Sequence, residues 1–558
     1  MSFGPHGQRS EAYRPVVAGR HGMVCAGHPL AAQAGQSILQ RGGTAVDAAL
    51  GVAAALNVVE PNMSGMGGDG IIMIYTADTG EIRVVNATGP APARATREAY
   101  LPDGIPMKGM RSVSVPGLVS GWLTAHAAAG RLSVADDLGP AIELAEHGFP
   151  ISDKLAQGIA EDSSLAQFPS SRAIFTRDGV PLATGQLLVQ RDLAESFRRL
   201  ASDGAAGYYQ GAFAQALQRC SEDYDGLITA DDLAGFEAVW QDPISVDYRG
   251  YTVYEAPPNS SGHVLLQMLN LIEPYDISGL GTSSAESIHL MVEAKKLAFA
   301  DRELYLADPR FVDVPIDGLL SKNYARERGL GIDRNRASES VVAGNPWTHQ
   351  PHEQSPRGVA ESRENTTCFV VVDSAGNAVC QLQSIQSGFG SGLVPPGTGI
   401  LLNNRMTYWH LEPEHVDVLV PGKRVRHTMN PVMVQRDGKL ILACGTPGAD
   451  TQVQTNLQVV CHVLDGHYNV VEAVEAPRWR HLQDGTESTV PHHCLDELLL
   501  EARFPGNVQS ELRRRGQPVR VIGPWEATGS EMMIQLDPVS GARFGGADPR
   551  RDGYAIGW

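Results

Sequence analysis

Two adjacent threonines, Thr366 and Thr367, stand between a polar, turn-rich stretch and a β-branched run at 368–372. A chain break before Thr366 would leave a threonine as the new N-terminus at the start of a buried strand. Its hydroxyl is a weak nucleophile at neutral pH, but a free α-amine with a pKa of roughly 8 can take the hydroxyl proton within one residue. The pattern favours amide cleavage by an N-terminal nucleophile. The plain alternative is a Thr-Thr pair that serves only β-propensity.

Further motifs lie before and after Thr366, at 42–49, 64–70, 257–262, 365–373, 374–379, 387–392, 399–404 and 445–448. These motifs follow one another in the order found in γ-glutamyltransferases. The chain resembles that family roughly from residue 22 to residue 557.

The resemblance implies a fold and a processing event. The implied fold is α/β, the four-layer αββα sandwich of N-terminal-nucleophile hydrolases. Self-cleavage between Asn365 and Thr366 would divide it into a large subunit, 1–365, and a small subunit, 366–558, intertwined as one domain. The partners implied are a small-molecule amide substrate and these two subunits, either as a heterodimer or as a dimer of heterodimers. Thr367 is the alternative cut site, but the spacing to Asp373 in the family pattern favours Thr366.

The resemblance also carries catalytic roles to this chain. Ser384 matches a hydroxyl residue that orients the nucleophilic threonine, and Gln386 stands where relatives have an asparagine. Gly448 and Ala449 match two glycines whose amides stabilise the oxyanion. Alanine disfavours positive φ, so this loop either stays right-handed there or is strained. The alternatives are a solvated strand residue for Gln386 and a plain turn at Gly448.

The largest departures from the family concern substrate recognition. Thr88 replaces an arginine that binds the glutamyl carboxylate, and Tyr408 replaces an aspartate that binds the ammonium. Arg405 replaces a neutral glutamine, and His427 with Thr428 replaces a pair of serines. A buried ammonium without a counter-charge is costly, so the pocket favours an anionic acyl group that lacks the amine. The alternative for Arg405 is a loop arginine paired with a surface carboxylate.

These features are similar to the oxamate amidohydrolase and glutaryl-type cephalosporin acylase branches of the family. They predict a self-processing amidohydrolase or acyltransferase for small carboxylated acyl groups. The first alternative is an ordinary glutathione hydrolase with a rearranged pocket. The second is an inactive relative that acts as a binding protein, since Gln386 and Ala449 both depart from the family pattern.

Local patterns predict the elements that position these residues. Strands are expected at 71–75, 368–372, 378–385 and 440–444, and helices at 48–59, 455–464 and 470–476. A capping-box pair, Ser283 with Glu286, predicts the start of another helix. The polar segment 331–365 has little apolar periodicity and is expected to be a mobile processing loop.

Composition limits the partners and the compartment. A net charge of -18 argues against nucleic acid and anionic membranes. Seven cysteines without close pairing fit reduced thiols in a cytoplasm, and the N-terminus lacks the pattern of a signal peptide. No CxxC or HExxH motif occurs, and nucleophile, base and oxyanion donors all come from the chain, so no metal or cofactor is expected.

Overall fold

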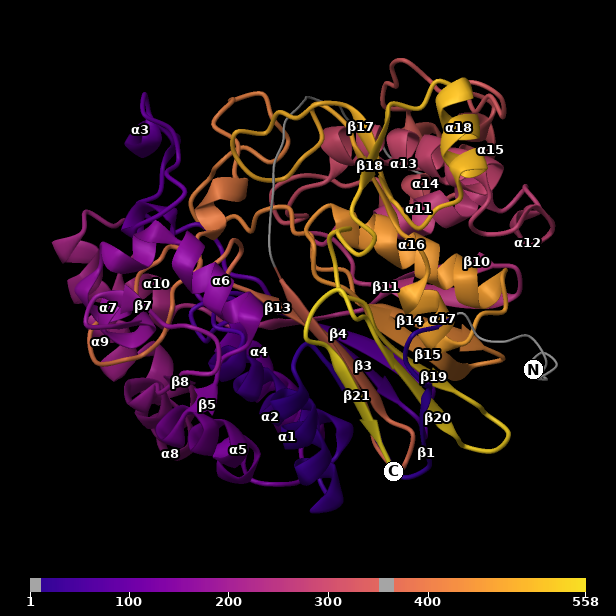
Figure 1. Ribbon diagram of the computed structural model, residues 1–558. Helices are drawn as coiled ribbons and strands as arrows, with labels where there is room; N and C mark the ends of the chain where they lie inside the picture. The colour runs from indigo at the N-terminus through magenta and orange to yellow at the C-terminus, as the bar shows by residue number, and fades with distance from the viewer. Residues whose placement is uncertain (1–11, 351–365) are drawn as a thin grey trace.

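The computed structural model describes residues 12–350 and 366–558. Two seven-stranded antiparallel sheets form its centre (Figure 1). The first sheet has the order β21 (Tyr554–Gly557), β2 (Met23–Ala26), β12 (Thr367–Val372), β13 (Ala378–Ser384), β3 (Asp69–Thr76), β4 (Glu81–Ala87) and β9 (Val239–Gln241). The second has the order β1 (Val17–Gly19), β20 (Arg543–Ala547), β19 (Met532–Leu536), β15 (Lys439–Gly445), β14 (Val432–Arg436), β11 (Tyr251–Glu255) and β10 (Ile244–Tyr248).

Helices cover the outer face of each sheet, and apolar side chains fill the space between the sheets. This is the four-layer αββα sandwich that the family resemblance implies. The first sheet carries α1 (Pro29–Gln40), α2 (Ala45–Val59), α4 (Leu118–Ala129), α5 (Val134–His147) and α8 (Arg191–Tyr209). The second carries α11 (Gly262–Ile272), α13 (Ala285–Tyr305), α16 (Thr451–Leu464) and α17 (Val470–Glu475).

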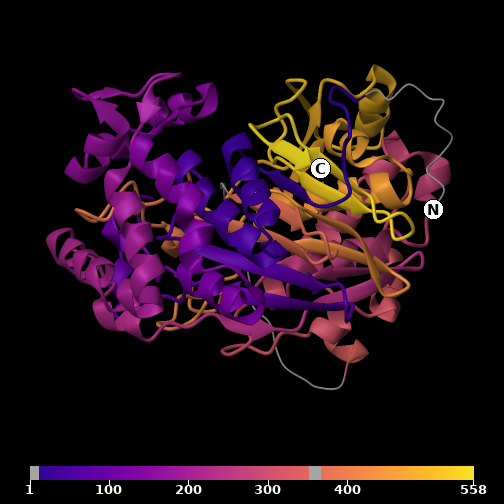
Figure 2. The same cartoon turned by 90° about the horizontal axis from the view of Figure 1, so that it is seen from below.

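The strands on the two sides of Thr366 are interleaved. In the first sheet, β12 and β13 lie between β2 and β3, with β12 pairing to β2 and β13 pairing to β3. In the second sheet, β20 pairs with the N-terminal β1. Figure 2 shows the yellow C-terminal strands beside the indigo N-terminal segment. Segments 12–350 and 366–558 therefore share both sheets and the apolar layer between them.

The predicted strands and helices are present, with small differences at their ends. Helix α2 begins three residues before the predicted start, because Thr44 caps it in a reciprocal capping box with Asp47, and all its residues are buried. The predicted capping box at the start of α13 is wrong. Ser284, not Ser283, is the N-cap, and its side chain accepts a hydrogen bond from the Ser287 amide.

Part of the predicted processing loop is described. Residues 331–350 contain only one short 3₁₀ turn, Pro346–His349, as expected for a segment without periodicity. Backbone groups of this segment nonetheless bind α13: Gly344 N–H donates to Asp301, and Ser338 N–H donates to Glu293. The remainder, 351–365, lies outside the described residues, and mobility there stays a prediction.

None of the seven cysteines, all of which lie within the described residues, is joined in a disulfide, and six of them are buried. Among the described residues, no helix has both the length and the apolar character needed to cross a bilayer.

A buried carboxyl group between the layers gives a pH prediction. Burial raises the pKa of Glu531 from 4.5 to about 8, with Arg478 opposing that shift and Asp548 adding to it. Between these values the unfolded chain releases this proton more readily than the folded protein. Folding stability from Glu531 is therefore complete below pH 4.5 and is lost as the pH rises through 8, by on the order of 3 kcal/mol at pH 7.

Glu531→Gln cannot ionise, so its melting temperature relative to wild type should rise from pH 5 to pH 8. Calorimetry of both proteins at the two pH values measures this difference. A difference that is the same at both pH values would contradict the assignment.

Candidate active site

Thr366 lies directly before β12, in the interior of the molecule. Its Oγ1 is 3.4 Å from Ser384 Oγ, and both residues are buried. Ser384 ends β13 and is paired in register with Asp69 at the start of β3. The structure thus brings the predicted nucleophile and its predicted orienting hydroxyl together. Asn365, the other half of the predicted cleavage site, is outside the described residues.

Thr367 occupies a different environment from its neighbour. Its hydroxyl donates to Glu60 Oε2 at 2.7 Å, at the C-terminal end of α2. Burial raises the pKa of Glu60. The carbonyl oxygen of Thr366 accepts a hydrogen bond from Arg551 Nη1 at 3.2 Å. Thr367 is therefore held by Glu60, whereas Thr366 faces Ser384, which favours Thr366 as the nucleophile.

Gln386 is fully buried, so the solvated alternative is wrong. Its backbone N–H donates to Ser384 Oγ at 2.8 Å, and its Nε2 donates to Thr489 Oγ1 at 3.0 Å. A φ of +83° places it in the left-handed region, where most side chains are disfavoured. In this backbone conformation the Gln386 amide points toward Ser384 and the Gln386 side chain points toward Thr489.

The predicted oxyanion turn follows β15. Gly448 has φ +123° and Ala449 has φ +54°, so the alanine is in the left-handed region, at a cost of about 1–2 kcal/mol relative to glycine. Of the two predicted outcomes, the strained one holds. The next residue, Asp450, pairs with Arg302 and accepts from the Ser488 amide at 2.8 Å. Ser488 is followed by Thr489, which binds the Gln386 side chain, and the Gln386 amide binds Ser384 beside Thr366. A series of contacts therefore connects this turn to Thr366.

The predicted substrate-recognition residues surround a buried ion pair. Arg405 Nε donates to Asp69 Oδ2 at 3.0 Å, and both side chains are almost completely buried. The guanidinium lies over the Tyr408 ring, 4.4 Å from its centroid. The alternative of a surface pair is wrong, because Asp69 belongs to the glycine-rich motif at 64–70 and its carboxylate is interior.

Asp69 is also bound on its other sides. Its Oδ1 accepts from the Gly89 amide at 3.1 Å, and His427 Nε2 is 3.4 Å from Oδ2. Burial, aided by Arg405, lowers the pKa of His427 to about 4, so the ring is neutral at pH 7. Its Nδ1 accepts from the Met429 amide, which leaves Nε2 to donate to Asp69.

Thr428 and Thr88 are the remaining residues predicted to contact the substrate. Thr428 Oγ1 is 3.2 Å from the Tyr408 hydroxyl. The Thr88 hydroxyl donates to Asn86, and its carbonyl accepts from Arg424 Nε at 2.8 Å. Thr88 offers no charge where the family arginine would be.

Sequence reasoning missed four residues at this site: Asp69, Glu60, Thr489 and Arg551. Only Asp69 had a usable signal, an acidic residue inside a run of glycines. The others lie far from Thr366 in the sequence and carry no motif.

A four-layer αββα sandwich with a threonine at the head of a central strand defines the chain as an N-terminal-nucleophile hydrolase. The γ-glutamyltranspeptidase family model matches residues 31–558. The glutathione hydrolase-like YwrD proenzyme of Bacillus subtilis (strain 168) is 37% identical over 97% of this chain and 99% of its own. The oxamate amidohydrolase proenzyme of Klebsiella pneumoniae is 33% identical over 96% of this chain and 98% of its own.

A solved cephalosporin acylase from Bacillus halodurans superposes with a TM-score of 0.88 and 32% identity, covering 100% of this chain and 99% of that one. The chain belongs to the γ-glutamyltranspeptidase family and is an enzyme of that type.

Proposed function

We propose that this enzyme cuts itself between Asn365 and Thr366 and then cleaves amides of small carboxylated acyl groups. In the first step Thr366 Oγ attacks the Asn365 carbonyl, and the peptide bond becomes an ester with a free Thr366 amine. Water opens the ester and restores the hydroxyl. The two products, 1–365 and 366–558, remain together as a heterodimer because their strands are interleaved.

In catalysis the Thr366 amine takes the hydroxyl proton as Oγ attacks the substrate amide carbonyl. The amide groups of Gly448 and Ala449 are the proposed donors to the oxyanion, each worth roughly 3–4 kcal/mol. The tetrahedral intermediate collapses, the leaving amine takes the proton, and an acyl ester remains on Thr366. Water or a second amine then accepts the acyl group.

The Arg405–Asp69 pair carries the choice of acyl group. Arg405 uses Nε on Asp69, while its Nη2 is buried and has no hydrogen-bond partner among the described residues. An unpaired buried donor is costly, and a substrate carboxylate would satisfy it with a charge-assisted bond. Asp69 is the acidic group nearest to Arg405, but Arg405, Gly89 and His427 already surround it, which leaves it poorly suited to a substrate ammonium.

A substrate panel tests this proposal. Purified enzyme should hydrolyse glutaryl or succinyl p-nitroanilide, or release ammonia from oxamate, with a higher kcat/KM than γ-glutamyl p-nitroanilide. The comparison of glutaryl with γ-glutamyl is the sharpest, because the two acyl groups differ chiefly in the α-ammonium. A clear preference for the γ-glutamyl substrate would instead identify a γ-glutamyltransferase in which Asp69 binds the ammonium.

A further inference from the structure

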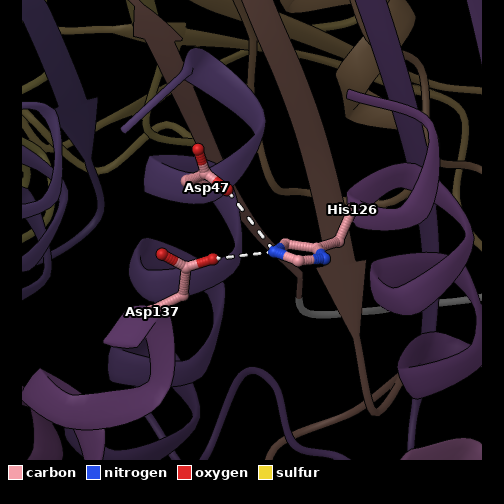
Figure 3. Close-up of side chains that lie close together, drawn as sticks. All are labelled: Asp47, His126 and Asp137. Atoms are coloured by element: carbon pink, nitrogen blue, oxygen red, sulfur yellow. Dashed lines mark ion pairs between the residues drawn. The ribbon is translucent and has the colours of Figure 1, made fainter. Parts of the chain in front are cut away.

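A second cluster of charged side chains lies in the outer helical layer, away from Thr366. His126 in the last turn of α4 points between Asp47 of α2 and Asp137 of α5 (Figure 3). Its Nε2 is 3.4 Å from Asp47 Oδ1 and 3.2 Å from Asp137 Oδ2. Along α2, Asp47 is thirteen residues from Glu60, or about 20 Å at 1.5 Å per residue. The cluster is therefore separate from the active site.

One imidazole nitrogen in this cluster faces three oxygens. Besides the two carboxylates, the Leu132 carbonyl oxygen is 3.0 Å from His126 Nε2. A single N–H points in one direction and cannot make three good hydrogen bonds. Asp137 is completely buried, and neither of its oxygens accepts a well-oriented hydrogen bond within the described chain; its charged neighbours there are the His126 ring and Asp47.

The geometry points to a binding site for a divalent transition-metal ion of the Zn²⁺ type, held by His126, Asp47, Asp137 and the Leu132 carbonyl. Donors about 2.1 Å from a common ion stand roughly 3.0–3.4 Å apart in octahedral or tetrahedral arrangements. The distances from Nε2 to the three oxygens lie in this range. One nitrogen and three oxygens, two of them anionic, suit a borderline divalent ion.

Two features support such a site beyond the donors themselves. Outer hydrogen bonds orient Asp47, whose carboxylate accepts from the Arg131 amide at 2.8 Å and the Thr44 amide at 2.7 Å, as is usual for metal-binding carboxylates. A Cβ at Gly130 would stand only 2.7 Å from His126 Nε2, so glycine keeps the side of this nitrogen open. The bound ion would join α2, α4 and α5.

A proton is the competing occupant. The carboxylates of Asp137 and Asp47 beside the ring raise the pKa of His126 to about 10, so a metal-free ring carries a proton between the two carboxylates. Titration with a metal salt distinguishes the protonated cluster from a metal site, because only a metal site binds the added metal ion in a saturable fashion.

Calorimetric titration of chelator-treated, full-length protein with ZnCl₂ separates them. Wild type should bind one equivalent through this site, and Asp137→Asn should weaken that binding at least a hundredfold. Asp136→Asn is the matched control, since Asp136 is the exposed neighbour on the same helix and should leave binding unchanged. Zn²⁺ should also raise the melting temperature of wild type and Asp136→Asn but not of Asp137→Asn.

His126→Gln provides a second test if Asp137→Asn does not fold, with self-cleavage as the sign of a folded chain. Zn²⁺ uptake by wild type that is no tighter than uptake by Asp137→Asn or His126→Gln would overturn the site and leave a proton as its occupant. Uptake that is equally weakened in Asp136→Asn would also overturn it.

Discussion

Replacing Thr366 by alanine should leave a single uncut chain of 59.8 kDa without amidase activity. No hydroxyl would remain to attack the Asn365 carbonyl, and no nucleophile would remain for the substrate. Wild type should instead run as fragments of about 39 and 21 kDa, in proportion to their lengths. N-terminal sequencing of the smaller fragment should begin Thr-Thr-Cys-Phe.

Thr367→Val is the matched control, because it removes the neighbouring hydroxyl at nearly constant shape. The Thr367 hydroxyl is bound to Glu60, so this variant should still be cut at the same bond. A fragment that begins at Thr367 would move the nucleophile by one residue. A wild-type chain that stays intact and still hydrolyses amides would disprove the mechanism, and one that stays intact without activity would indicate a binding protein.

Removing the guanidinium of Arg405 should lower kcat/KM for glutaryl or oxamyl amides by ten- to a hundredfold. A charge-assisted hydrogen bond to the substrate carboxylate is worth about 1.5–3 kcal/mol. Arg405→Met alone would leave Asp69 buried without its partner, which destabilises a protein by roughly 3–5 kcal/mol. The change is therefore best made as Arg405→Lys, and as Arg405→Met combined with Asp69→Asn.

Self-cleavage should survive in both variants, and this would show that both variants fold. Asp69→Asn alone is the companion variant and should reduce turnover less than the double change. The deciding readout is the ratio of kcat/KM for glutaryl p-nitroanilide and valeryl p-nitroanilide, which has the same chain length but lacks the carboxylate. If Arg405 serves only to hold neighbouring side chains in place, kcat/KM will fall equally for both substrates and the ratio will not change.

The strands and helices around Thr366 could be predicted because their patterns are local, whereas the four-layer fold and the orienting role of Ser384 came from the resemblance to a family. Thr366 sits at the junction of a polar segment and a β-branched run, and Ser384 ends the next strand. Such patterns depend on neighbouring residues and on a strand period that the chain itself displays. The start of α13 was misplaced by one residue, because two adjacent serines offer the same cap and only the backbone distinguishes them.

The Arg405–Asp69 pair could not be predicted, since its members are 336 residues apart. From the sequence Arg405 is a new positive charge in a pocket, and only the fold shows that Asp69 already accepts its Nε. Because Asp69 accepts from Nε, the Arg405 nitrogen proposed to bind the substrate carboxylate is Nη2. Likewise, His126 and Asp137 belong to no metal-binding motif, and their meeting with Asp47 depends on how three helices pack.

The interleaved sheets bear on whether the protein could refold after the proposed cleavage. While the chain is intact, β12 finds β2 at the modest entropic cost of closing a loop. After the proposed cut, the same pairing would require two molecules to meet, and each fragment alone would expose unpaired strand edges that favour aggregation. The chain would therefore have to fold first and be cut second. The lifetime of the cut enzyme would then be governed by its unfolding rate, because the route by which it folded would no longer exist.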